Sequence, residues 1–179
     1  MNNTEKIKTS KFLSMVLRHH PERINIKLDN NGWASVNELL LNMQNTKYKL
    51  SFEELKDIVD TNDKKRYIFN EDFTKIRASQ GHSIKIDLGL ESIEPPDVLY
   101  HGTSTRFIDG IMNEGLKKMN RQHVHLSKDI ETATKVGSRH GKPAILEIAA
   151  RAMAADGYVF YLSDNGVWLT DDIPVEYIK

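Results

Sequence analysis

The sequence predicts an α+β protein built from two lobes. Its first half carries three short helical patterns followed by two strand patterns, whereas its second half mixes short strands with two helices. A stiff polar stretch, Glu94-Pro95-Pro96-Asp97, separates the two halves. We therefore expect an N-terminal lobe over residues 1–84, a connector over residues 85–97, and a C-terminal lobe over residues 98–179 in which short antiparallel strands pack with helices.

Composition narrows the class of protein. The chain has 179 residues, of which 39% are hydrophobic and 28% charged, with 25 basic and 25 acidic side chains. A net charge of zero argues against binding long nucleic acid by bulk electrostatics, although it allows a local basic pocket. The lack of cysteine excludes disulfides and cysteine-ligated zinc and fits a reducing cytoplasm. We find no membrane-spanning run, and nothing in the sequence demands a dimer.

Residues 10–21 predict the first helix. We expect Ser10 as its N-cap and Pro21 as its end, because proline pushes the preceding residue out of the helical region. The apolar stripe of this helix consists of Phe12, Leu13, Val16 and Leu17. Arg18, His19 and His20 lie at its closing end. Cations there complement the helix dipole, so this stretch alone allows either a structural role or presentation of Arg18 and His19 to an anionic ligand.

Two further helices and a hairpin complete the N-terminal pattern. Ser35 and Ser51 each begin a capping box, and the residues after them predict helices. Residues 67–69 and 74–78 predict a β-hairpin. Three helices followed by a hairpin is the order of a winged helix. The helix after Ser51 starts Phe52-Glu53-Glu54 and is acidic, so we do not expect it to read a DNA groove.

The C-terminal lobe opens on a predicted buried strand, Val98-Leu99-Tyr100. It runs into His101-Gly102-Thr103-Ser104, which we expect to form a glycine-containing turn before a helix that ends at Gly115 as a left-handed cap. Strand, turn and helix N-terminus would together form an anion site. The core side of this helix is expected to consist of Phe107, Ile108, Ile111 and Met112.

The rest of the lobe predicts strands and one more helix. Ser127 is the expected cap of a helix from Lys128 to about Arg139. Asp164-Asn165-Gly166 is a strong hairpin signal. The expected strands cover residues 123–127, 143–148, 158–162, 167–170 and 175–178.

The histidines suggest other kinds of site. His123 and His125 face the same side of a strand, but a third metal ligand is missing, so we expect no metal. The segments His101-Gly102-Thr103 and His125-Leu126-Ser127 are similar to the two-histidine phosphoesterases, which cleave cyclic phosphates with one histidine as base and one as acid. A cyclic phosphodiesterase using His101 and His125 and a non-enzymatic winged-helix nucleic-acid binder therefore both stay open.

A series of ordered motifs covers nearly the whole chain, from about Ser10 to Tyr177. Together they resemble the NAD-dependent RNA 2'-phosphotransferases, which comprise the tRNA splicing 2'-phosphotransferase and its bacterial relatives. The motifs are Ser10-Lys11-Phe12-Leu13-Ser14 with Leu17-Arg18-His19, Gly32-Trp33, Asp63-Lys64-Lys65-Arg66, Ile76-Arg77-Ala78-Ser79-Gln80-Gly81-His82-Ser83, Leu99-Tyr100-His101-Gly102-Thr103, His123-Val124-His125-Leu126-Ser127, Arg139-His140-Gly141-Lys142-Pro143 and Asn165-Gly166-Val167-Trp168-Leu169.

The resemblance implies a winged-helix-like RNA lobe joined to an ADP-ribosyltransferase-like lobe that binds NAD. It also implies a two-step reaction on RNA with an internal 2'-phosphate, such as a tRNA splice junction. The phosphate attacks C1 of the nicotinamide ribose and expels nicotinamide. The ribose 2-hydroxyl of the ADP-ribosylated RNA then attacks that phosphate, which leaves a 2'-hydroxyl on the RNA and yields ADP-ribose 1",2"-cyclic phosphate.

The resemblance further implies roles for individual residues. Arginine binds phosphate oxygens bidentately and stays charged, which suits a phosphorane-like transition state, and a histidine with a pKa of about 6.5 can protonate or position the departing oxygen. The implied catalytic residues are Arg18, His19, Arg66 and Arg121. The implied NAD-binding residues are His101, Gly102, Thr103, Ser104, Ser127, Arg139 and His140. The implied RNA-binding residues are Lys64, Arg77, Gly81, His82 and Ser83.

Overall fold

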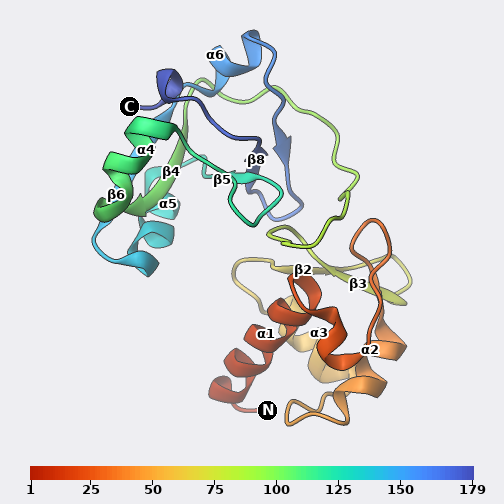
Figure 1. Cartoon of the computed structure of the whole chain (residues 1–179). Helices are drawn as coiled ribbons and strands as arrows, with labels where there is room; N and C mark the ends of the chain where they lie inside the picture. The colour runs from red at the N-terminus through yellow and green to blue at the C-terminus, as the bar shows by residue number, and fades with distance from the viewer. The chain divides into compact units, whose positions relative to one another are not determined.

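The computed structural model describes the whole chain, Met1–Lys179 (Figure 1). Helices and small antiparallel sheets occur throughout, so the protein is α+β. The chain divides into two compact units, which we call the N-terminal unit (Met1–Gly89) and the C-terminal unit (Leu90–Lys179). Each unit has its own hydrophobic core. No helix combines the length and the apolar character needed to cross a membrane.

The N-terminal unit combines three α-helices with a three-stranded antiparallel sheet in the order β1-β3-β2. Strand β2 pairs with β3 from Tyr67↔Ala78 to Phe69↔Ile76, which confirms the predicted hairpin. Its elements are α1 (Asn3–Arg18), the 3-10 helix η1 (Pro21–Ile24), β1 (Ala34–Ser35), α2 (Val36–Met43), α3 (Phe52–Asp60), β2 (Tyr67–Phe69) and β3 (Lys75–Ala78).

Helix α1 begins earlier than predicted. The expectation that Ser10 caps it was wrong, because Asn2 and Glu5 form a complete capping box with two bonds of 2.9 Å. A reciprocal box satisfies two backbone donors, whereas a lone serine satisfies one. Ser10 instead lies within the helix, where its carbonyl accepts the hydroxyl proton of Tyr67. The helix ends at Arg18, before Pro21, as predicted.

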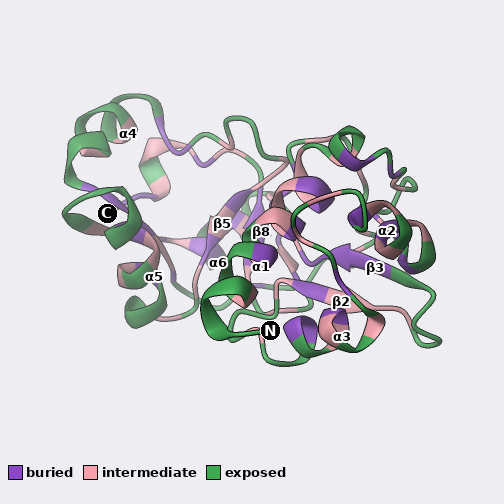
Figure 2. Ribbon diagram, turned by 90° about the horizontal axis from the view of Figure 1, so that it is seen from below, coloured by how far each residue is buried: buried purple, intermediate pink, exposed green.

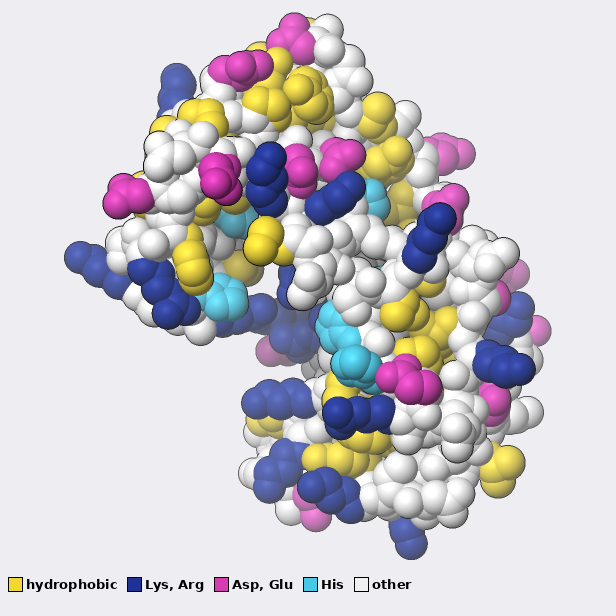
Figure 3. Space-filling view, in the orientation of Figure 1, with side chains coloured by type: hydrophobic (Ala, Val, Ile, Leu, Met, Phe, Trp, Pro, Cys, Tyr) yellow, Lys and Arg dark blue, Asp and Glu magenta, His cyan; other side chains and the backbone are white.

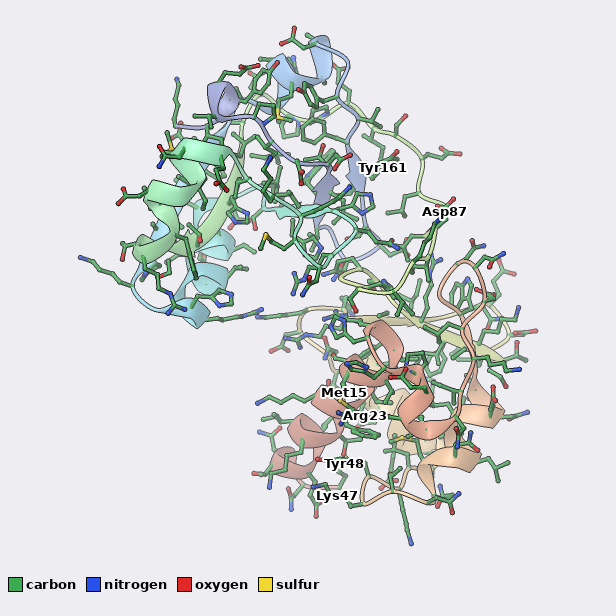
Figure 4. All side chains as sticks on the ribbon, viewed as in Figure 1. Met15, Arg23, Lys47, Tyr48, Asp87 and Tyr161 are labelled. Atoms are coloured by element: carbon green, nitrogen blue, oxygen red, sulfur yellow. The ribbon has the colours of Figure 1, made fainter.

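The core of the N-terminal unit lies between the helices and the sheet. Figure 2 shows the buried residues along β3 and on one side of α1. Phe12 is only partly buried and stacks on Tyr48, which Figure 4 labels, with 4.6 Å between ring centroids. The most deeply buried side chains are Leu13, Val16, Leu17, Leu39, Met43, Leu55, Tyr67 and Ile76.

The C-terminal unit contains two small antiparallel sheets, β4-β6 and β5-β8-β7. A bridge between Tyr100 and Ser127 links them. Its elements are β4 (Leu99–Ser104), η2 (Thr105–Phe107), α4 (Ile108–Glu114), β5 (Val124–Leu126), α5 (Ile130–Gly137), η3 (Ser138–His140), β6 (Pro143–Ile148), α6 (Ala150–Ala155), β7 (Tyr161–Leu162), β8 (Trp168–Thr170) and η4 (Val175–Tyr177).

Helix α4 differs from its prediction in what it buries and in how it ends. Phe107 and Met112 are 45% and 39% exposed, so only Ile108 and Ile111 of the four expected core positions pack against the core. Gly115 ends the helix, but with φ 82° and ψ 178° it is not a left-handed cap. A side chain there would place Cβ 2.3 Å from the carbonyl oxygen of Ile173, so the close approach of two backbones requires glycine.

Three other expectations for this unit were wrong. Residues 175–177 form a 3-10 helix rather than a strand, and only Ile178 bridges to β6. Helix α6 was not foreseen, since Ala150–Ala155 lacks a polar cap and has too little polar contrast for a periodic pattern. Helix α5 is capped by Asp129, whose carboxylate accepts from the Thr132 N–H at 2.7 Å, and not by Ser127.

Candidate active site

The His101-Gly102-Thr103-Ser104 segment lies in a strand, and the expected turn was wrong. Strand β4 pairs with β6 through six residue pairs, from Leu99↔Ile148 to Ser104↔Pro143. Ser104 precedes η2 without a side-chain cap bond. The segment is therefore not the strand-turn-helix anion site that its composition suggested, and any ligand must use the side chains and edges of this sheet.

Gly102 is present because helix α5 lies directly on strand β4 (Figure 1). A Cβ at Gly102 would lie 1.7 Å from the carbonyl oxygen of Ala133. Gly137 meets the same strand from the helix, where its Cβ would lie 2.6 Å from the carbonyl oxygen of Thr103. Because side chains alternate along a strand, α5 covers the side of Gly102 and Ser104, and His101 and Thr103 face the other way.

His101 has a defined tautomer. Its Nδ1 lies 3.0 Å from the carbonyl oxygen of His125, and a carbonyl can only accept, so Nδ1 carries the proton and Nε2 keeps its lone pair. Burial lowers the pKa of His101, and the nearby His140 lowers it further, although the bond to His125 opposes both effects. At neutral pH the ring is therefore an uncharged acceptor that suits a hydroxyl group.

His125 also contacts Arg121. The guanidinium Nη1 of Arg121 donates to Nδ1 of His125 at 3.0 Å, since arginine has no acceptor. The Nδ1 atoms of His101 and His125 are thus both engaged within the protein. No group of three or more His, Asp or Glu side chains is arranged to hold a metal ion.

The remaining residues that the resemblance assigns to NAD lie around these strands. Ser127 forms two backbone bonds of 2.8 Å with Tyr100, which places it beside β4. Arg139 and His140 lie on η3 and are exposed, and this short helix packs against β4. The C-terminal unit therefore gathers His101, Ser127 and His140 near one strand, with Arg121 joined to it through His125.

In the N-terminal unit, the loop after β3 docks on the end of α1. The backbone N–H of Ser83 donates to the carbonyl oxygen of Arg18 at 3.0 Å. The hydroxyl of Ser83 lies 2.8 Å from Nδ1 of His19. Two motifs that are far apart in the sequence therefore meet, and Ser83 orients the imidazole of His19.

His82 lies beneath this contact and is only 2% exposed. Its Nε2 has no hydrogen-bond partner and faces Gly32, where a Cβ would come within 3.2 Å of it. Burial is the main reason that the pKa of His82 falls to about 4, and the charges of Arg18, His19 and Arg77 lower it further. His82 is therefore a neutral spacer among cations, rather than another cation exposed to a ligand.

Arg66 is held by the turn before β2. Its N–H donates to Oδ1 of Asn62 at 3.1 Å, and its carbonyl accepts from the N–H of Ser79 at 2.8 Å. The Ser79 hydroxyl also donates to the carbonyl of Lys65, a residue with a positive φ of 47°. These bonds fix the backbone from which Arg66 and Lys64 project, and Lys64 is exposed.

Arg77 was expected to bind RNA, but its side chain is buried. It is 8% exposed, and its guanidinium carbon lies 4.4 Å above the ring centroid of Trp33. Its Nη1 donates to the carbonyl oxygens of Asn31 and Leu88 at 3.2 and 3.1 Å. The side chain thus ties the turn before β1 to the segment after β3. Of the five expected RNA-binding residues, Lys64 and Ser83 are exposed, and Arg77, Gly81 and His82 are buried.

Charge is distributed over both units without one dominant sign. The space-filling view in Figure 3 shows dark blue and magenta side chains interspersed on the visible face. The total of 25 basic and 25 acidic residues agrees with this picture. The visible face therefore offers no broad basic surface for long nucleic acid.

The structure thus places Arg18 and His19 together at the end of α1 and a neutral His101 on β4. Comparison with known families shows the class of protein to which this chain belongs. The model of the "RNA 2'-phosphotransferase, Tpt1 / KptA family" matches residues 4–172, and the chain belongs to this family.

Several relatives carry the name "Probable RNA 2'-phosphotransferase". The one from Flavobacterium johnsoniae is 58% identical over 179 residues, which is 100% of this chain and 98% of the relative. The one from Fusobacterium nucleatum is 55% identical and covers 97% of each chain. A third, from Nostoc punctiforme, is 50% identical over 100% of this chain and 99% of its own length.

Proposed function

We propose that this protein moves an internal 2'-phosphate from RNA to NAD, with release of nicotinamide and passage through an ADP-ribosylated RNA. The products are RNA with a 2'-hydroxyl and ADP-ribose 1",2"-cyclic phosphate. In this proposal the N-terminal unit is the winged-helix-like RNA lobe, and the C-terminal unit is the ADP-ribosyltransferase-like lobe that binds NAD. The family and the names of the relatives support the RNA 2'-phosphotransferase part.

The observation that carries the proposal is the contact between the end of α1 and the Ser83 loop. Ser83 holds the main chain of Arg18 through its backbone N–H and the imidazole of His19 through its hydroxyl, so both residues share one support. Buried His82 stays neutral beside them, which avoids adding a further positive charge. Such a cluster suits a phosphate dianion, because its oxygens can accept several charge-assisted bonds at once.

Arg66 and Arg121 complete the proposed catalytic set with Arg18 and His19. Each arginine projects from a backbone fixed by hydrogen bonds, Arg66 through Asn62 and Arg121 through its N–H to the carbonyl oxygen of Lys118 at 3.1 Å. Fixed donors stabilise charge that develops in a transition state without reorganising, and loss of one typically slows a reaction by about 10²–10³-fold. His19 would protonate or position the departing RNA 2'-oxygen.

The residues around β4 fit NAD as a co-substrate. His101 offers Nε2 as an acceptor, which suits a ribose hydroxyl, and its low pKa keeps it uncharged. The exposed Arg139 and His140 suit the pyrophosphate. Thr103 faces the same side of β4 as His101, whereas Gly102 serves the packing of α5.

The test uses a short RNA labelled at its 5' end that carries one internal 2'-phosphate. We expect loss of the phosphate only when NAD is added, with nicotinamide and ADP-ribose cyclic phosphate detected by mass spectrometry. Arg23→Ala serves as the control for the arginine variants, because this exposed arginine lies on η1 and is not one of the proposed site residues (Figure 4). A folded protein that leaves the RNA unchanged with NAD would refute the proposal. Cleavage of a 2',3'-cyclic phosphate that depends on His125 would favour a phosphodiesterase.

A further inference from the structure

The His123-Val124-His125 motif has no part in the function proposed above, yet His125 lies between two groups that do. Its carbonyl oxygen accepts the Nδ1 proton of His101 at 3.0 Å. Its own Nδ1 accepts from the guanidinium of Arg121 at 3.0 Å. One residue thus links the proposed NAD-binding strand to a proposed catalytic arginine.

We propose that His125 is a positioning residue that holds the guanidinium of Arg121 in its working orientation. This inference rests on the proposed function. His125 itself touches neither RNA nor NAD in this account. It acts by offering a lone pair at Nδ1 to Arg121, while its main chain is fixed from two sides.

The main chain of His125 is a rigid base for this contact. Strand β5 pairs with β8, and His125 lies opposite Leu169. Leu169 is fully buried. The bond from His101 fixes the carbonyl of His125 from the neighbouring sheet. The imidazole of His125 therefore projects from a main chain that is held in place on two sides.

Arg121, in contrast, projects from the loop between α4 and β5 rather than from a strand. Leu116 and Ile173 form two backbone bonds of 2.9 and 2.8 Å where the loop begins, and β5 closes it. Within the loop, the N–H of Lys118 donates to Asp172 at 2.7 Å. The adjacent Met119 is 81% exposed. The backbone near Arg121 is thus held, but its long side chain needs a partner, because free arginine rotamers carry about 2 kcal/mol of entropy.

The test exploits the geometry of the imidazole. His125→Asn places an amide oxygen close to where Nδ1 lies and keeps an acceptor for Arg121. His125→Gln and His125→Ala remove that acceptor, and His123→Ala is the matched control, since its ring packs against Tyr161 on β7 (Figure 4). Each variant is first checked for its thermal unfolding midpoint. The readout is single-turnover conversion of 2'-phosphorylated RNA, with the ADP-ribosylated intermediate measured separately.

We expect His125→Ala and His125→Gln to slow the second step by about 10- to 100-fold, the loss typical of a misplaced catalytic group. ADP-ribosylated RNA would accumulate, and His125→Asn and His123→Ala would convert it as the native protein does. In an Arg121→Ala background, His125→Ala would add less than about twofold, because the two side chains act as one unit.

Two other results would overturn the inference. If His125→Ala is folded and processes the intermediate at the native rate, His125 does not position Arg121. If the rate loss caused by His125→Ala adds in full to the rate loss caused by Arg121→Ala, His125 acts independently of Arg121. Failure of the proposed function would look different, since the native protein would then show no NAD-dependent loss of the 2'-phosphate.

Discussion

The two units of this protein build their candidate sites by different means. In the N-terminal unit, Ser83 holds the end of α1 through its backbone bond to Arg18 and its hydroxyl contact with His19, while Arg77 ties the segments of Asn31 and Leu88 together. In the C-terminal unit, a strand is pressed against a helix through the glycine pair Gly102 and Gly137. The candidate site of the N-terminal unit depends on charged side chains and the hydrogen bonds that hold them. The candidate site of the C-terminal unit depends on the close approach of the β4 and α5 backbones.

Each unit also keeps a histidine neutral, for a different use. His82 is buried among cations and has its Nε2 without a partner. His101 is only half-buried, and its Nδ1 bond to His125 leaves Nε2 as an acceptor. The comparison teaches that burial can keep a histidine neutral both among cations, as for His82, and where one ring nitrogen is bonded to a carbonyl, as for His101.

The largest effect should come from the backbone contact in the C-terminal unit. Gly102→Ala would place Cβ 1.7 Å from the carbonyl oxygen of Ala133, so strand and helix must separate. We expect a loss of at least about 4 kcal/mol of unfolding free energy, or failure to fold. Denaturation in urea measures this. The matched control is Gly110→Ala, which meets nothing within 4 Å in α4 and should be neutral or slightly stabilising. Equal stability of Gly102→Ala and Gly110→Ala would contradict the claim that the C-terminal unit depends on this close backbone contact.

The second effect tests the charged site of the N-terminal unit. We expect Arg18→Ala to slow removal of the 2'-phosphate by about 10²–10³-fold, because a fixed guanidinium is lost from the phosphate. Arg18→Lys should recover only part of the rate, since lysine lacks the bidentate fork. Single-turnover assays at saturating NAD measure both variants. A rate for Arg18→Ala near that of the control Arg23→Ala would contradict the assignment.

The third effect concerns the pH dependence of stability. The unfolded chain protonates His82 near pH 6.5, whereas the folded protein does so only near pH 4. The stabilising contribution of neutral His82 is therefore complete above pH 6.5 and is lost as the pH falls toward 4. At pH 5 the loss is about 2 kcal/mol. Urea unfolding at pH 7.5 and pH 5 should show that His82→Leu loses less stability than the native protein. Parallel pH profiles would argue that His82 titrates normally.

The smallest effect comes from one buried hydroxyl. Tyr67 is 1% exposed, and its hydroxyl lies 2.6 Å from the Ser14 hydroxyl and donates to the carbonyl oxygen of Ser10. Tyr67→Phe removes these bonds between β2 and α1, so we expect a loss of about 1 kcal/mol. The thermal midpoint of Tyr67→Phe can be compared with that of Tyr48→Phe, a partly exposed ring that should change little. A larger loss in Tyr48→Phe would contradict this account.

The two units differ in how much of their structure could be predicted from the sequence. The hairpin after Tyr67 and the helix capped by Ser51 follow from local patterns, and both were predicted correctly. The start of α1 was not, because a capping box at Asn2 outweighs the apolar stripe that suggested Ser10. Local chemistry decides these elements, so the errors there are errors in choosing between two local signals.

In the C-terminal unit, the choice of Ser127 over Asp129 was also a local error, but the misread Gly102 segment depends on contacts between distant segments. Gly102 looked like a turn residue, and only the carbonyl of Ala133 shows why a strand needs glycine at this point. Likewise, no local pattern reveals the bond from His101 to His125, because it depends on how two sheets meet. The motif residues could be named from the sequence, but the supports that orient them could not.

The most direct test of this account is a crossed binding experiment on two variants, one from each unit. Calorimetry would measure NAD and a short 2'-phosphorylated RNA separately, each binding to His101→Ala and to Arg66→Ala. We predict that His101→Ala weakens NAD binding by about tenfold and RNA binding by less than about twofold, and that Arg66→Ala does the reverse. Equal weakening of both ligands by both variants, or the opposite pairing, would contradict the division of the site between a charge-based unit and a backbone-packed unit.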